Sequence, residues 1–246
     1  MFLITLFCNI HVILSLYVKS IFMKIFTCFI ICFHFIVVAQ DKYPYNKWTS
    51  QEYSWASSSN VVGYMDSTEK EIIFLCNLVR INPKLFRSTY LQEYIDLNGL
   101  DDKNYYVSSL IKTLEEIKPT HILKPDSNLF LMARYHAVKM GEKGKVGHYD
   151  FESRCKKFLK GKFVIVGENC SYGSFDAIDI FMDLLIDEGI SDLGHRENIL
   201  KKVYNCIGVS IQSHKTYQIN CVLDFGCDKV RIKEKPLIYK ILFWIK

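Results

Sequence analysis

The chain lacks a strong excess of charge of either sign. Its 246 residues include 31 lysines and arginines against 26 aspartates and glutamates. Residues 1–40 contain only two of these charges, Lys19 and Lys24, so the remainder carries 29 basic and 26 acidic residues, a formal net charge of +3. A nucleic-acid-binding protein usually shows a clustered basic surface. The charge balance therefore argues against nucleic acid as a partner.

Local catalytic motifs are also missing. No serine or cysteine lies in an evident nucleophile motif, and no internal repeat is visible. The histidines that accompany carboxylates are too far apart for a zinc motif of the H-E-x-x-H type. Any functional site must therefore be assembled by the fold from distant segments.

Residues 1–40 are almost free of charge and consist mainly of two apolar runs. Residues 2–18 and 25–39 are apolar runs, each shorter than the roughly 20 residues that a membrane-spanning helix needs. The second run follows Met23-Lys24 and ends in Val37-Val38-Ala39-Gln40. A basic start, an apolar core and a small-residue cleavage site are typical of a secretory signal. We expect residues 1–40 to be this signal and the protein to be secreted or extracytoplasmic (periplasm or cell surface). Met23 is a second candidate for the start of translation. An uncleaved membrane anchor and a two-span hairpin are the alternatives to a cleaved signal.

Six cysteines remain outside this segment: Cys76, Cys155, Cys170, Cys206, Cys221 and Cys227. An even number of cysteines in an exported chain predicts disulfides. Cys206 and Cys221 are the expected pair, because they flank a predicted hairpin. The alternative is a set of buried free thiols, since free cysteine packs as a small hydrophobe.

The rest of the chain predicts a mixed α/β domain. Residues 41–66 are expected to be a linker or a strap on the domain. Thr68-x-x-Glu71 has the pattern of a capping box that opens a helix, which Asn82-Pro83 ends. The clearest helix starts at residues 125–127 and ends near Gly141, because its apolar residues recur with helical spacing. A short strand is expected at residues 163–166, and a further helix at 176–185.

The C-terminal part predicts a β-hairpin. Runs 206–211 and 217–224 alternate as strands do, and residues 213–216 form the connecting loop, with His214 exposed in it. Residues 229–246 form a basic and apolar tail. Such a tail either contacts a membrane surface or packs on the domain.

The most informative feature is a set of four separated segments: Gly147-His148, Gly167-Glu168-Asn169, Asp187-Glu188 and Gly194-His195-Arg196-Glu197-Asn198. Three of them place a glycine beside the polar residues, and glycine allows the tight backbone geometry that can direct a side chain into a cleft. Imidazoles with carboxylates are a ligand set that zinc accepts.

The order of these segments resembles the CAP superfamily of cysteine-rich secretory, antigen 5 and pathogenesis-related 1 proteins. The supporting segments are the helix through residues 133–140, Ile207-Gly208-Val209 and Asp224-Phe225-Gly226. The segment 194–200 reads G-H-R-E-N-I-L, which is typical of the bacterial branch. The resemblance covers roughly residues 67–227 and implies a CAP (SCP) domain at 67–228. The implied fold is α/β, a three-layer α-β-α sandwich with a large cleft.

The resemblance also implies a cleft lined by two histidines and two acids. His148, Glu168 and His195 match three of the four positions; Asp187 is the choice for the fourth, with Glu188 behind it. Some family members bind a divalent metal through the two histidines, so His148 and His195 are the expected metal ligands, with zinc as the metal. Other members carry sterols or fatty acids. Asn169, Arg196 and Asn198 are expected to support the site, the asparagines by tying loops through hydrogen bonds and Arg196 through an ion pair.

Three functions follow from these residues. The first is an extracellular binding module whose cleft takes a metal, a small molecule or a lipid. The second is a metal-assisted hydrolase of the peptidase type, in which a metal on His148 and His195 lowers the pKa of a bound water and Glu168 is the general base. The third is a cell-surface interaction protein with a vestigial cleft. The sequence favours a protein without enzymatic activity, because two histidines are fewer ligands than the three of catalytic zinc sites. The partner is a small molecule, a lipid or a protein.

The signal interpretation predicts that the mature protein begins at Gln40. N-terminal sequencing of the protein recovered from outside the cytoplasm measures this directly. A chain that is intact from Met1 or Met23 would show a membrane anchor instead.

Overall fold

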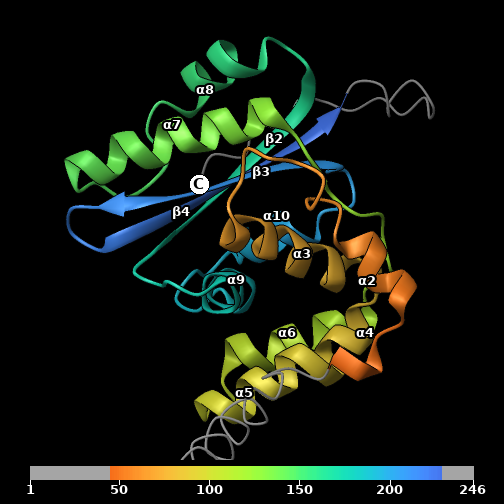
Figure 1. Ribbon diagram of the computed structural model, residues 1–246. Helices are drawn as coiled ribbons and strands as arrows, with labels where there is room; N and C mark the ends of the chain where they lie inside the picture. Colours follow the sequence, from red (N-terminus) through yellow and green to blue (C-terminus); the bar gives the residue numbers. More distant parts are fainter. Residues whose placement is uncertain (1–44, 229–246) are drawn as a thin grey trace, which may run out of the picture. The chain divides into compact units, whose positions relative to one another are not determined.

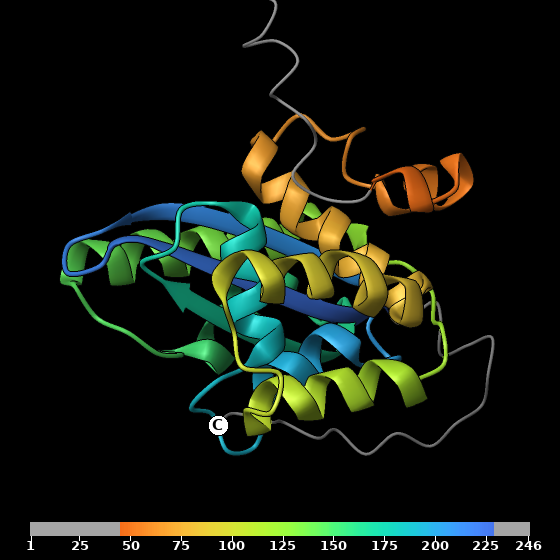
Figure 2. The ribbon, with the colours of Figure 1, turned by 90° about the horizontal axis from the view of Figure 1, so that it is seen from below.

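The computed structural model describes residues 45–228 (Figure 1). The predicted signal and the C-terminal tail lie outside the described residues. Four strands form one sheet in the order β1-β3-β4-β2, in which β1 runs parallel to β3 and the other pairs are antiparallel. The strands are β1 (Lys124–Pro125), β2 (Phe163–Tyr172), β3 (Cys206–His214) and β4 (Gln218–Asp228). β2 therefore lies beside β4 at one border of the sheet (Figure 2).

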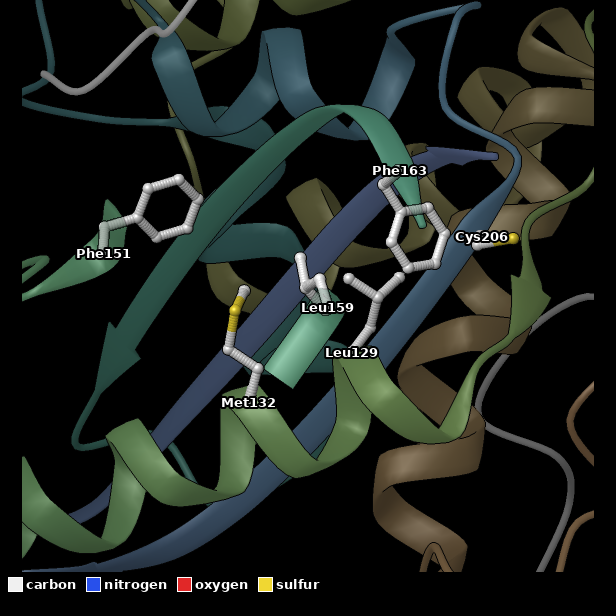
Figure 3. Packing of buried hydrophobic residues seen from close by; sticks show 6 residues of the cluster. All are labelled: Leu129, Met132, Phe151, Leu159, Phe163 and Cys206. Atoms are coloured by element: carbon white, nitrogen blue, oxygen red, sulfur yellow. The ribbon is translucent and has the colours of Figure 1, made fainter. Parts of the chain in front are cut away.

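One face of the sheet is covered by α7 (Ser127–Lys143), the helix with the clearest apolar spacing. Ala133 and Ala137 of α7 are fully buried against Cys170 and Val222 of the sheet. Toward the start of the helix, Leu129 and Met132 pack with Phe163 and with a short helical segment, α8 (Phe151–Arg154) and η3 (Cys155–Leu159) (Figure 3). This face holds part of the apolar core.

The opposite face is covered by α3 (Ser67–Ile81), α9 (Ala177–Ile186) and α10 (Gly194–Leu200). Glu69 of α3 accepts a hydrogen bond from the Ile211 amide of β3 at 2.9 Å. Figure 1 shows α7 on one side of the strands and these three helices on the other. The three-layer α-β-α arrangement expected from the sequence is confirmed.

Further helices extend the layer of α3 and α9. They are α4 (Pro83–Phe86), η2 (Arg87–Leu91), α5 (Gln92–Asn98) and α6 (Tyr105–Glu116). The ring of Phe86 contacts that of Phe181 in α9 edge-on, with centroids 5.7 Å apart. No helix in residues 45–228 is both long enough and apolar enough to cross a membrane.

The described part of the predicted strap is folded onto the domain. It contains η1 (Tyr45–Lys47) and α2 (Ser50–Ala56), which begins with a capping box between Thr49 and Glu52. Trp48 is buried and donates to Thr89 Oγ1 at 3.2 Å. Asn77 of α3 donates to the Ala56 carbonyl at 3.1 Å. The sequence did not predict α2, whose apolar residues are few.

The capping box of α3 lies two residues earlier than predicted. Asp66 is the N-cap, and its carboxylate accepts from the Glu69 amide at 2.8 Å while Glu69 accepts from the Asp66 amide at 2.9 Å. Thr68 and Glu71 have the same capping-box spacing as Asp66 and Glu69. The helix begins at the earlier pair because Glu69 is also held by β3 through its other carboxylate oxygen.

The strands are longer than predicted. β2 continues through Gly167-Glu168-Asn169 to Tyr172, so these residues lie within a strand and do not turn sharply. β3 extends to His214, and only residues 215–217 connect the hairpin. His214 is 2% exposed and bonds the Lys145 carbonyl through Nε2 at 3.0 Å, so the expectation of an exposed histidine was wrong.

The predicted disulfide is also wrong. All six cysteines in the described residues are free. Cys206 pairs with Gly226 in the ladder and Cys221 pairs with Ile211, five residues further along β3. At about 3.3 Å per residue, this register separates the two cysteines by roughly 16 Å, beyond the reach of a disulfide. Burial raises the pKa of Cys76 and Cys206 to about 12, so the alternative of packed free thiols is confirmed for them.

Gly208 lies at a point of close approach between α7 and the sheet. A Cβ there would overlap the backbone of Leu129 and Phe130, and backbone cannot move aside as a flexible side chain can. We expect Gly208→Ala to lower the free energy of unfolding by about 3 kcal/mol in urea denaturation. Gly63→Ala is the matched control, since nothing lies within 4 Å of its Cβ position. Equal stability of the two variants would contradict the close packing.

Candidate functional site

A cleft of about 770 Å³ opens at the border of the sheet formed by β2. Its floor is formed by Glu168, Cys170, Ser171 and Tyr172 of β2. One wall comes from residues 146–151 on the side of α7, and the other from residues 183–201, which include the end of α9 and the whole of α10. Pockets that bind small ligands commonly have volumes of roughly 300–1,000 Å³.

The first histidine of the cleft is paired with a buried glutamate. His148 Nδ1 lies 2.8 Å from Glu168 Oε1, and the Glu168 side chain is 2% exposed. Arg154 of α8 binds the same carboxylate through both terminal nitrogens of its guanidinium, at 2.5 and 2.9 Å. Burial alone would raise the pKa of Glu168, but the hydrogen bonds from His148 and Arg154 lower it to about 2. Glu168 is therefore a stable carboxylate at neutral pH.

The second histidine has an equivalent partner that is built differently. His195 Nδ1 lies 2.7 Å from Asp187 Oδ1, and Asp187 Oδ2 accepts from the amides of His195 and Arg196 at 2.9 and 3.1 Å. Asp187 caps the C-terminus of α9 in the left-handed conformation, with φ of 61°. Aspartate tolerates this conformation better than most residues, and its short side chain reaches the first turn of α10 from there.

The two histidines therefore present the same chemistry to the cleft. A carboxylate at Nδ1 fixes the tautomer that carries its hydrogen on Nδ1, so Nε2 is left as the lone-pair donor. The side chains of His148 and His195 are 22% and 23% exposed, while the carboxylates behind them are buried. His148, Glu168, Asp187 and His195 all line this one cleft.

Two of the predicted supporting residues connect the floor of the cleft to one wall. Asn169 Nδ2 donates to the His195 carbonyl at 2.9 Å, and Asn198 Nδ2 donates to Asn169 Oδ1 at 2.9 Å. Glu188 lines the cleft and accepts from Asn104 at 3.1 Å. The two asparagines thus tie β2 to α10.

Arg196 differs from the prediction. Its guanidinium forms no ion pair within the described residues. It donates to the carbonyls of Leu185, Ile186 and Tyr106 and to Ser109 Oγ, over 2.6–2.9 Å. Arg196 therefore satisfies the carbonyls at the C-terminus of α9 and joins α6 to that end, which positions Asp187.

Three charged or polar groups behind the cleft were not predicted. Arg154 is one; the second is His136 of α7, whose Nε2 lies 2.8 Å from the Gly147 carbonyl and 3.8 Å from Glu168 Oε1. The third is Asp224, which lies opposite Glu168 in the β2–β4 ladder and is fully buried. Burial and the adjacent Glu168 carboxylate raise the pKa of Asp224 well above its usual range. The one signal in the sequence is that Asp224 is a charged residue within the otherwise apolar run 221–227.

The side chains of His136, Glu168 and Cys170 offer ligand atoms within 4.8 Å of one another, close enough to share a metal ion. Their surroundings oppose a cation, because Arg154 already neutralises Glu168. Burial also raises the pKa of the Cys170 thiol, which disfavours the thiolate that a metal needs.

Comparison with known proteins agrees with this architecture. The sequence model of the cysteine-rich secretory protein family, CAP, matches residues 118–225, which include α7, strands β1 to β3, most of β4 and both histidine–carboxylate pairs. This region is a CAP domain. The match begins at residue 118, so α2–α6 precede it. The resemblance to CAP proteins seen in the sequence is confirmed.

One solved structure similar to this chain is that of an outer surface protein from Borrelia burgdorferi. It is 21% identical, the alignment covers 53% of this chain and 97% of that one, and the TM-score is 0.39. No curated protein sequence matches the chain significantly.

Asp224 of the CAP domain should make stability fall as pH rises. A carboxyl whose folded-state pKa exceeds its usual 3.8 contributes stability below that value, and this contribution is lost as pH rises toward the folded-state pKa. Asparagine cannot ionise. Relative to the wild type, the unfolding free energy of Asp224→Asn should therefore rise with pH above about 4, by at most about 1.4 kcal/mol per unit.

Urea denaturation at a series of pH values measures this difference. Asp102→Asn, at an exposed position, is the control and should follow the wild-type pH dependence. Parallel curves for Asp224→Asn and the wild type between about pH 4 and 8 would contradict a neutral buried Asp224.

Proposed function

We propose that this CAP domain is an extracytoplasmic binding module whose cleft holds a divalent metal ion, zinc in the first instance, on Nε2 of His148 and His195. The observation that carries the proposal is the pair of equivalent histidine–carboxylate units. Each imidazole is oriented by a buried carboxylate at Nδ1, at 2.8 and 2.7 Å, and both histidines line the same cleft.

The donor set fits a metal of this kind. Histidines that bind metals usually donate their other ring N–H to a carboxylate, which fixes the ring and makes the binding nitrogen more basic. Two imidazoles leave further coordination positions of zinc to water or to a ligand in the cleft. A bound metal would supply a positive charge and a Lewis acid there.

Binding is favoured over hydrolysis by the state of Glu168. A general base should have a pKa near the working pH, whereas two nitrogens of Arg154 hold Glu168 as a weakly basic carboxylate with a pKa of about 2. Glu168 is suited to orienting His148.

A small organic ligand or a lipid is the second candidate for the cleft. Val146, Ile190 and Tyr217 line it and are 45%, 39% and 47% exposed, so apolar surface is available at its walls. The extracytoplasmic location is supported by the signal pattern in residues 1–40 and by the secretory character of the family.

Zinc titration by calorimetry of the purified protein from Gln40 to Lys246 tests the metal site. We expect micromolar binding by the wild type and none by the His148→Ala/His195→Ala double variant, with little change in the thermal unfolding of the metal-free protein. Unchanged zinc affinity in the double variant would overturn the site.

Asp187→Asn provides a finer test, because it retains both histidines. Asparagine removes the charged acceptor that orients His195, so zinc affinity should fall by about 10- to 100-fold. Wild-type affinity in this variant would mean that the Asp187 carboxylate does not tune a metal ligand.

A further inference from the structure

The floor of the cleft is the border strand of the sheet, and the register of that strand shows which groups it turns outward. In an antiparallel ladder, hydrogen-bonded pairs alternate with non-hydrogen-bonded pairs. The Gly173 amide donates to the Ile219 carbonyl at 3.1 Å, one step beyond the pair Tyr172–Asn220. The main-chain N–H and C=O groups of residues 171 and 169, two and four positions before Gly173, therefore also face β4. Glu168, Cys170 and Tyr172 turn their N–H and C=O groups toward the open border.

Contacts and exposure agree with this assignment. The side chain of Asn198 reaches the Glu168 carbonyl at 3.4 Å from the side away from β4. Within residues 45–228, this is the only hydrogen bond that the outward main-chain groups of Glu168, Cys170 and Tyr172 form. Glu168 as a whole is 7% exposed while its side chain is 2% exposed, so the surface that it shows to the cleft is mostly main chain.

The two walls of the cleft differ in character. The wall from α9 to α10 carries five carboxylates, those of Asp183, Asp187, Glu188, Asp192 and Glu197, against one lysine, Lys201. On the side of α7 the lining is mainly apolar and aromatic: Val146 and Phe151 accompany His148 on the wall, and the rings of Tyr217 and of Tyr172 from the floor lie beside them. A ligand that lies along β2 therefore meets negative charge on one side and apolar surface on the other.

We propose that the cleft binds an extended peptide segment from another protein, which adds to β2 as a fifth strand and carries alternating basic and apolar side chains. Successive side chains of a strand point to opposite faces, so basic residues would meet the acidic wall and apolar residues the aromatic wall. From Glu168 to Tyr172 the border is roughly 13 Å long, the span of about five residues. The inference rests on the proposal that the cleft is a binding site, and it does not depend on the metal.

The test uses the protein from Gln40 to Lys246, in EDTA, with a fluorescein-labelled probe peptide Lys-Val-Lys-Val-Lys-Val that is amidated at its C-terminus. Fluorescence anisotropy should show saturable binding. The matched peptide Glu-Val-Glu-Val-Glu-Val should not bind, because the acidic wall repels it. Equal binding of the two peptides, or no binding of the lysine peptide, would overturn the inference.

Strand addition has a signature that simple charge attraction lacks. Only every second residue of an added strand directs its N–H to β2. Of two probes, one N-methylated at all lysines and one at all valines, one should lose at least about tenfold in affinity and the other should bind nearly as the parent does. If both methylated probes lose affinity equally, or if neither loses affinity, strand addition is overturned.

Charge reversal on the protein separates the cleft from the rest of the surface. Glu188→Lys should weaken binding of the lysine peptide about fivefold, while Glu116→Lys, an exposed change outside the cleft, should leave it unchanged. Equal effects would place the peptide elsewhere. Zinc binding without peptide binding would overturn the peptide site and leave the metal proposal standing. Peptide binding in EDTA without zinc binding would overturn the metal proposal and leave the peptide site standing.

Discussion

The carboxylate of Glu168 is the constraint on which the cleft depends. A charged group with a side chain 2% exposed must be neutralised and hydrogen-bonded in place, and Arg154 and His148 do this from two different segments. The same contacts fix α8 and the loop before it against β2, so they form one wall of the cleft. If Arg154 were lost, a buried charge would remain without its main partner, and both the wall and the orientation of His148 would be released.

Asp224 extends this constraint into the centre of the sheet. It lies directly across the ladder from Glu168, where two ionised carboxylates would repel each other in a buried environment. Its raised pKa resolves the conflict, because a protonated Asp224 carries no charge and can offer its hydrogen to the Glu168 carboxylate. Arg154 thus balances one negative charge. The two acids divide into a charged member at the cleft and a neutral member in the core.

The second histidine–carboxylate pair is also held in a fixed orientation, but by the geometry of the backbone. Asp187 is held at a helix terminus in the left-handed conformation, and Arg196 binds the carbonyls of that terminus. One histidine of the cleft is therefore oriented by a carboxylate that is ion-paired with an arginine. The other is oriented by a carboxylate that caps the end of a helix. Acid pH acts on the first through Glu168, whose contribution to stability falls as pH drops from about 4.5 toward about 2.

Periodic apolar spacing made helices such as α7 predictable, whereas the order of the layers was implied by the resemblance to CAP proteins. Three residues of the tetrad, His148, Glu168 and His195, lie in glycine-containing segments that match the family pattern, and Asp187 was chosen from its position before the last of them. Arg154 was not predicted, because its contact with Glu168 depends on how α8 packs against β2. Asp224 was not predicted either, since its role follows from which residue the ladder places opposite it, and register is a property of the folded sheet. The Cys206–Cys221 disulfide was wrongly predicted for the same reason, because the sequence does not show which residues of β3 and β4 lie opposite each other. Asp66 and Thr68 offer equivalent capping patterns, and only the contact of Glu69 with β3 distinguishes them.

A border strand with open main-chain groups is a liability, because it can pair with other sheets and lead to aggregation. Proteins usually cover or distort such a border. In this CAP domain, β2 is neither covered by another strand of the described residues nor free on the surface: residues 146–151 and 183–201 enclose it from both sides. Walls of this kind exclude the flat edge of another sheet, whereas a single extended chain can enter between them. The walls that carry the two histidines therefore also make the open border selective, so a metal on the walls and a peptide on the floor would use different groups of one cleft.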